Sequence, residues 1–172
     1  MRKLFLILLI YLFNFNLTLA QTNIAFIDMD KVLSTSKPGL SIMTQLKDIN
    51  SNNKNKFDDE AKKLKEKETK LISQKNILSE KDFQLNINKL KLEFKKFNEI
   101  RNKKNSDLNK LKIDSTNKVL KLINPILIKF SNEKSISLIL QKKNLILGKT
   151  ELDITDEIIM IINDEINEFK IN

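Results

Sequence analysis

The chain has 172 residues, with 31 Lys and Arg against 22 Asp and Glu, and it contains neither Cys nor His. The absence of these two residue types excludes disulfides, thiolate and imidazole metal sites, and catalysis by cysteine or histidine. The formal net charge of +9 implies an anionic partner or surface.

Residues 1–20 have the pattern of a secretory signal peptide. Arg2 and Lys3 form a short basic start, an apolar run follows, and small residues end the segment at Ala20. The alternative is an uncleaved membrane anchor, but the apolar run is shorter than the roughly 20 residues that a membrane-spanning helix needs. We therefore expect export, with cleavage between Ala20 and Gln21.

A short apolar segment, Asn23 to Met29, is rich in strand-forming residues and predicts a first β-strand. Pro38 and Gly39 mark the point where the chain leaves this region. The 85 residues from Leu40 to Asn124 contain neither Pro nor Gly, and Leu, Lys, Glu, Gln and Asn dominate them. This interval therefore predicts long helix.

An antiparallel hairpin is the better prediction for this interval, because a single straight helix would reach about 130 Å with little support. The best turn lies at residues 76–79. Ser79 can cap the second helix, and Glu80 and Asp82 favour its positive start. Each arm would then be roughly 60 Å long.

The segment from Ser51 to Ile113 concentrates the positive charge. It holds 18 basic and 10 acidic residues, and only 18 of its 63 residues are apolar. A segment of this composition cannot build a thick core, so it suits a slim cationic projection.

Apolar residues in the projection follow three- and four-residue steps, which predicts a coiled-coil seam. Glu68, Arg101 and Lys104 occupy positions where apolar residues are expected, and they interrupt the seam. The seam residues are Phe57, Ala61, Leu64, Leu71, Ile87, Leu90, Phe94, Phe97, Leu108 and Leu111.

The last third of the chain changes from helical to extended patterns. Pro125 predicts a kink or a restart of the second helix. Residues 136–140 and 145–147 then read as two strands of a β-hairpin. Thr155, followed by acidic residues, predicts the N-cap of a final helix.

These segments, taken in order, resemble the Skp (OmpH-like) family of periplasmic outer-membrane protein chaperones. The resemblance covers the chain after the signal peptide. It is strongest in the first strand, Ile24 to Met29, and in Leu152-Asp153-Ile154-Thr155 before the last helix.

The resemblance implies a homotrimer in which three subunits pool their strands into a small β-body. Three hairpin arms would extend around a central cavity that holds unfolded outer-membrane proteins. The implied protein is an ATP-independent holdase of the periplasm that prevents aggregation during outer-membrane assembly, without enzymatic activity and without a cofactor. Trimerisation would also give open strand edges their partners.

The expected fold class is therefore α+β, with a long antiparallel helical hairpin that projects from a small β-body. The hairpin, a coiled-coil arm, would comprise residues 46–124. The β-body and trimerisation region would comprise residues 21–45 and 125–172.

The densest basic cluster of the arm is interleaved with apolar residues and is the candidate surface for contact with a client or an anionic surface. The alternative is a solvated face that keeps the arm soluble, with the phenylalanines serving helix packing. The family is also linked to lipopolysaccharide binding, and the resemblance leaves open whether this chain binds it. The candidate residues are Phe94, Lys95, Lys96, Phe97, Arg101, Lys103 and Lys104.

Two other functions compete with this interpretation. Nucleic-acid binding is disfavoured, because phosphate clamping and base readout favour Arg and the chain has only Arg2 and Arg101. A structural coiled coil of the cell envelope, without client binding, is the stronger alternative. The acidic run at residues 58–60 is a solvated charge run, because adjacent helix positions point to different faces.

Overall fold

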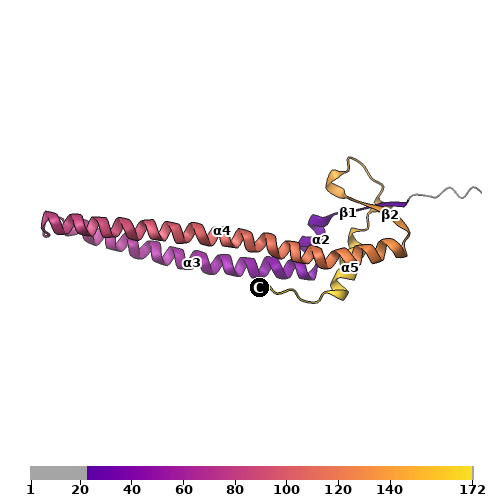
Figure 1. The fold of residues 1–172 in the computed structure, drawn as a ribbon, viewed down its shortest axis with the longest axis horizontal. Coiled ribbons are helices and arrows are strands. Elements are labelled where there is room, and N and C mark those ends of the chain that lie inside the picture. Colours follow the sequence, from indigo (N-terminus) through magenta and orange to yellow (C-terminus); the bar gives the residue numbers. More distant parts are fainter. Residues whose placement is uncertain (1–22, 172) are drawn as a thin grey trace, which may run out of the picture.

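The computed structural model describes residues 23–171 and shows a long helical hairpin that extends from a small base (Figure 1). The hairpin consists of α3 (Lys37–Ser73) and most of α4 (Glu80–Glu133). The predicted α+β fold with its long hairpin is confirmed. The predicted signal peptide and its cleavage site at Ala20 and Gln21 lie outside the described residues. The base contains β1 (Asn23–Ile27), α2 (Met29–Thr35), β2 (Ile136–Gln141), the 3₁₀ turns η1 (Lys142–Asn144) and η2 (Thr150–Leu152), and α5 (Thr155–Glu165).

Serine caps set the starts of both hairpin helices. The Ser36 hydroxyl accepts a hydrogen bond from the Gly39 amide at 3.4 Å, and the Ser79 hydroxyl accepts one from the Asp82 amide at 3.2 Å. The predicted turn and its Ser79 cap are confirmed. With 37 and 54 residues, α3 and α4 are about 55 Å and about 81 Å long.

The seam between α3 and α4 is a narrow line of apolar contacts. Leu64 and Leu71 are buried, whereas Phe57 and Phe97 are half-buried. Ala61, predicted as a seam residue, is exposed, because a single methyl group covers little of the helix surface. The arm therefore has no thick core of its own, as its composition predicts.

β1 and β2 pair in parallel and form the two-stranded sheet of the described residues. Ile24 lies opposite Leu138, and Phe26 lies opposite Leu140. The predicted β-hairpin of residues 136–140 with 145–147 is therefore wrong. The partner of β2 is the distant strand β1, and η1 turns the chain away directly after β2.

Residues 145–149, which follow η1, pass Phe26 without pairing with the sheet, and an isolated parallel bridge to Phe26 forms only further on, at Asp153. Gly148 lies so close to this ring that an added Cβ atom would be 2.7 Å from Phe26 Cε1. A larger residue would force the loop or the ring to move. The loop leaves Ile146 and Leu147 almost fully exposed.

The core of the base lies where α2, α4 and α5 meet. Val32, Val119, Ile158 and Ile162 are completely buried there. α2 starts at the Asp28 cap, whose carboxylate accepts from the Lys31 amide at 2.9 Å. This core joins the root of the hairpin to the sheet.

α4 runs through Pro125 and continues to Glu133. Of the two predicted outcomes, a kink or a restart, the restart is wrong. Pro125 removes one backbone hydrogen bond, but Ile123, Ile126 and Phe130 on either side are buried in the base core. Their packing offsets the lost bond and keeps the helix continuous.

Thr155 is not the N-cap of α5, as the sequence pattern predicted. It is the first helical residue, and Ile154 occupies the cap position without a side-chain hydrogen bond. The Thr155 hydroxyl instead accepts a hydrogen bond from the Asp28 amide at 2.9 Å. The Thr155 hydroxyl is thus engaged in a long-range contact and does not cap the helix locally.

Candidate functional site

Part of the predicted basic cluster lines a groove between α3 and α4, midway along the arm. The groove has a volume of about 500 Å³. Lys96, Phe97 and Lys104 from the predicted cluster line it, together with Ile100. From α3 the lining residues are Asn53, Lys56, Phe57, Glu60, Leu64 and Lys67, and α4 also contributes Glu93.

Two aromatic rings form the floor of this groove. Phe57 and Phe97 meet edge to face, with ring centroids 6.2 Å apart. The Arg101 guanidinium lies over the Phe97 ring, 5.8 Å from its centroid. Arg101 therefore packs on an aromatic of the floor and stays close to the groove.

The rim carries more positive than negative charge. Lys67 on α3 pairs with Glu93 on α4 at 2.6 Å and ties the two helices together. Glu60 lies 3.8 Å from Lys63. Lys56, Lys96 and Lys104 have no carboxylate within 4.0 Å among the described residues, so their charges are available to a ligand.

The remaining predicted residues do not line the groove. Lys95 lies 4.0 Å from Glu99 on its own helix. Phe94 is half-buried and Lys103 is exposed. The structure therefore divides the predicted cluster: some members gather at the groove, and others lie on the open surface of α4.

Sequence reasoning missed the contribution of Lys56 and Lys67. The signal was present in the predicted hairpin, because residues at equal distances from the turn face each other in an antiparallel pair. Phe57 and Phe97 each lie about 20 residues from the turn at residues 76–79. Applying this register would have placed Lys56 between Lys96 and Lys104, and Lys67 nearer the tip, opposite the stretch of α4 that precedes Glu93.

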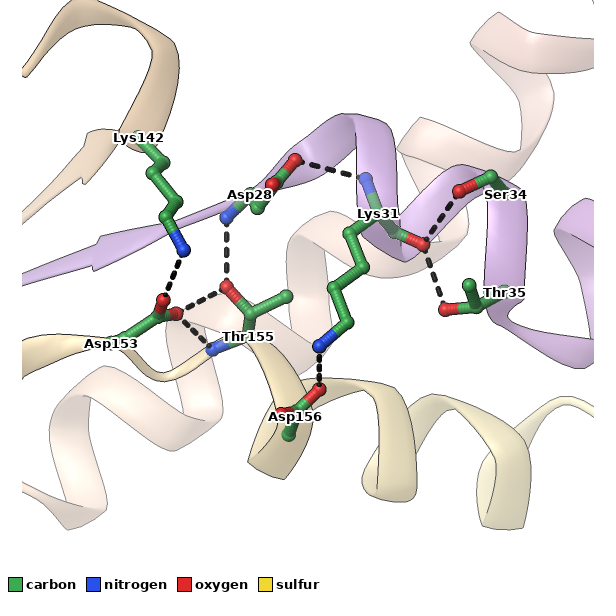
Figure 2. A network of polar contacts seen from close by, with 8 residues as sticks. All are labelled: Asp28, Lys31, Ser34, Thr35, Lys142, Asp153, Thr155 and Asp156. Carbon is green, nitrogen blue, oxygen red and sulfur yellow. Dashed lines mark hydrogen bonds and ion pairs between the residues drawn. The ribbon is translucent and has the colours of Figure 1, made fainter. Parts of the chain in front are cut away.

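A polar network in the base fixes the two segments on which the sequence resemblance rests (Figure 2). The Thr155 hydroxyl accepts from the Asp28 amide and donates to Asp153. Lys142 donates to Asp153 at 2.8 Å, and Lys31 pairs with Asp156 at 2.6 Å. The network links the end of β1, η1 and the start of α5.

The charges in this network shift two pKa values. Burial raises the pKa of Asp153, but hydrogen bonds from Lys142 and from the Thr155 hydroxyl and amide outweigh it, so the pKa lies below its ordinary value of 3.8. The hydrogen bond to Asp153, together with the charge of Asp153, raises the pKa of Lys142. Both groups are therefore held in their charged forms.

A second groove, of about 930 Å³, lies in the base between β2 and the end of α4. It is largely apolar and open. Ile128 and Leu138 line it with 55% and 47% of their surface exposed. Within residues 23–171, about half of each of these two side chains is left uncovered.

Residues 23–171 contain no group of three or more acidic side chains placed to hold a metal ion. Over the same range, no helix is long and apolar enough to cross a membrane.

The fold places this chain in a class of elongated proteins, in which a long helical hairpin extends from a small α+β base. Sequence comparison then specifies the family. A profile described as "Outer membrane protein (OmpH-like)" matches residues 23–162. The chain therefore belongs to the OmpH-like family. The resemblance drawn from the sequence is confirmed at the level of the family.

A solved structure supports the same fold. It is the crystal structure of a candidate outer membrane chaperone (OmpH-like) from Caulobacter crescentus CB15. The two chains share 14% identity with a TM-score of 0.81, and the match covers 88% of this chain and 89% of the other. At this identity the likeness concerns the fold. No curated protein shows significant sequence similarity to this chain.

Proposed function

We propose that this protein is an ATP-independent holdase chaperone of the periplasm. It would bind unfolded outer-membrane proteins and prevent their aggregation during outer-membrane assembly. Membership of the OmpH-like family supports the role, as does the fold shared with a candidate outer membrane chaperone. The family is generally non-enzymatic, in keeping with a function that rests on binding alone.

The observation that carries the proposal is the slim cationic arm. Its seam leaves apolar side chains at the surface between lysines: Leu85, Leu92 and Ile100 are exposed by 52%, 66% and 46%. An unfolded β-barrel chain presents alternating apolar and polar residues. Such a chain can make many weak contacts along the arm.

The proposal divides the chain by role. Residues 46–124 form the client-binding arm, and residues 21–45 with 125–172 form the assembly region. Export follows from the signal pattern of residues 1–20. The charge of the arm also suits the anionic membrane surface and lipopolysaccharide as further partners.

A homotrimer is part of the proposal. Three features of the base support an assembly of identical copies: the uncovered apolar groove, the unpaired outer edge of β2 in the described sheet, and the exposed Ile146 and Leu147. Three arms around one cavity would raise the effective concentration of weak binding surfaces near a client.

An aggregation assay tests the holdase role. The chain beginning at Gln21 is present while a urea-unfolded β-barrel outer-membrane protein is diluted into buffer without nucleotide, and light scattering is followed. We expect scattering to fall as the chaperone is added and to level off near one trimer per client. An inert coiled-coil protein of equal length serves as the control.

The same assay distinguishes the holdase role from the main alternative function. A purely structural coiled coil of the envelope would leave the scattering unchanged. That result, obtained with a chain whose helix content is intact, would contradict the holdase role.

A further inference from the structure

We call the groove between α3 and α4 the mid-arm groove. It exists because polar residues replace apolar residues at one place in the seam. Asn53 is half-buried on α3, and Arg101 and Lys104 occupy seam positions on α4 where an apolar residue would close the gap between the helices. Toward the tip, Leu64 and Leu71 restore a buried seam. The opening is therefore local and has a defined apolar floor.

We propose that this groove selects acidic segments of an unfolded client that carry an aromatic or branched side chain. The apolar side chain enters against Phe57, Phe97 and Ile100, and flanking carboxylates pair with Lys56, Lys96 and Lys104. This inference rests on the proposed holdase function and names the kind of segment that the arm prefers.

Charge complementarity supports this occupant. The groove is lined by four Lys and two Glu, and one Lys is neutralised by its 2.6 Å pair with Glu93. Lys56, Lys96 and Lys104 thus face the opening without a carboxylate in contact among the described residues. A negatively charged segment gains from these charges, and a basic one is repelled.

The two carboxylates of the lining favour a polypeptide over a lipid. Glu60 and Glu93 accept hydrogen bonds, and an unfolded polypeptide supplies free backbone N–H donors. The phosphate group of an anionic lipid supplies only acceptors when ionised, so it can pair with the lysines but offers no donor to the two carboxylates. A client chain therefore satisfies both kinds of lining residue.

Peptide binding tests the inference directly. Three fluorescein-labelled unstructured peptides are compared by anisotropy with the chain that begins at Gln21: one with Phe flanked by Asp, one with the Asp replaced by Lys, and one with the Phe replaced by Ser. We expect the first to bind at least about tenfold more tightly than the others, because it alone combines the charge and the ring.

Matched lysine variants locate the binding. The triple variant K56Q/K96Q/K104Q removes three charges at the groove, and K110Q/K112Q/K118Q removes three exposed charges elsewhere on α4. At about two- to fivefold per lysine, the first should weaken the Asp-Phe peptide by at least about tenfold. The second should change binding by less than about threefold. Equal effects of the two triples would mean a diffuse charge effect and would overturn the inference.

A second pair of variants tests the floor without breaking the aromatic contact. Ile100→Ser shortens a lining side chain that is 46% exposed, and Ile113→Ser does the same at a 60% exposed site of α4 outside the groove. We expect Ile100→Ser alone to weaken the Asp-Phe peptide, by about three- to tenfold. Unchanged binding in both would contradict the role of the floor.

Two further measurements distinguish failure of the groove assignment from failure of the holdase role. If K56Q/K96Q/K104Q lost binding to phosphatidylglycerol vesicles but kept the Asp-Phe peptide, the groove would be a lipid site and the inference would fall. If the wild-type chain bound the peptide at the groove but did not suppress barrel aggregation, the holdase role would fall and the groove assignment would stand.

Discussion

The hydroxyl of Thr155 joins three parts of the base. It accepts from the amide at the end of β1, donates to Asp153, and lies on a residue that is 2% exposed. Asp153 in turn holds Lys142 from η1. These few polar groups fix the parallel sheet to α5, in a small base that no disulfide stabilises.

Asp153 gives the base a defined pH dependence. Because its pKa is lower in the folded chain than its ordinary value of 3.8, its contribution to stability is present above that value and is lost as pH falls through the folded pKa. We expect Asp153→Asn to reduce stability at neutral pH, because the charged hydrogen bond from Lys142 to Asp153 is lost. The variant should also lose less stability than the wild type between about pH 7 and about pH 3.

Urea unfolding followed by circular dichroism, at equal protein concentration, checks this expectation. Glu151→Gln in the neighbouring exposed turn is the control, because it removes one carboxylate that makes no ion pair among the described residues. If the wild type and Asp153→Asn lost equal stability on acidification, the assignment to Asp153 would be wrong.

At this scale the sequence predicts what is local and misses what is distant. Ser79 and its acidic neighbours lie within one turn of helix, so the cap could be read directly. Thr155 has the same local pattern, but its partner, the Asp28 amide, lies 127 residues away. Nothing near Thr155 in the sequence indicates that contact.

The C-terminal segment after α5 is an element that the sequence pattern did not reveal. It runs back along the start of α3, where Gln45 donates to the Phe169 carbonyl at 2.7 Å and accepts from the Ile171 amide at 3.0 Å. Ser41 donates to the same carbonyl at 2.7 Å. The segment therefore fastens the root of the arm to the base.

Removing the Gln45 side chain should raise the mobility of the C-terminal segment more than it lowers the stability of the whole fold. We expect Gln45→Ala to cost about 1–2 kcal/mol and to raise hydrogen exchange in residues 166–171 by about tenfold, because both hydrogen bonds from this side chain to the segment are lost. Thr44→Ala, at an exposed neighbouring site, is the control. Unchanged exchange in the segment of Gln45→Ala would show that its apolar contacts alone hold it.

Helices and strands of this chain differ in how well the sequence predicts them. The hairpin helices follow from three- and four-residue periodicity, which lies within each helix. The sheet does not, because β1 and β2 pair across the whole arm, and residues 145–147 have a strand pattern without a strand partner in the described chain. The register of the hairpin, which builds the mid-arm groove, needs both helices and the turn together.

At the scale of the whole molecule, the apolar groove of the base is a surface that the proposed trimer would bury. Leu138→Asp places a charge in that groove, at a side chain that is 47% exposed in the single chain. We expect native mass spectrometry to give three times the chain mass for the wild type and mainly single chains for Leu138→Asp, because burying an unpaired charge costs several kcal/mol.

Leu92→Asp is the matched control, because Leu92 is 66% exposed on α4 in the arm. It should leave the mass unchanged, and circular dichroism should show intact helix in both variants. A wild-type chain that is a single copy, or a Leu138→Asp variant that stays threefold, would contradict the proposed assembly.

The unbroken course of α4 determines how the arm responds to a load. One helix of 54 residues runs from the tip turn into the packed core, past Pro125, without a loop between them. The arm therefore behaves as a cantilever clamped at one end. A sideways pull at the tip is absorbed as elastic bending along the rod, and the greatest bending moment falls at the clamp, where buried side chains on both sides of the proline resist it.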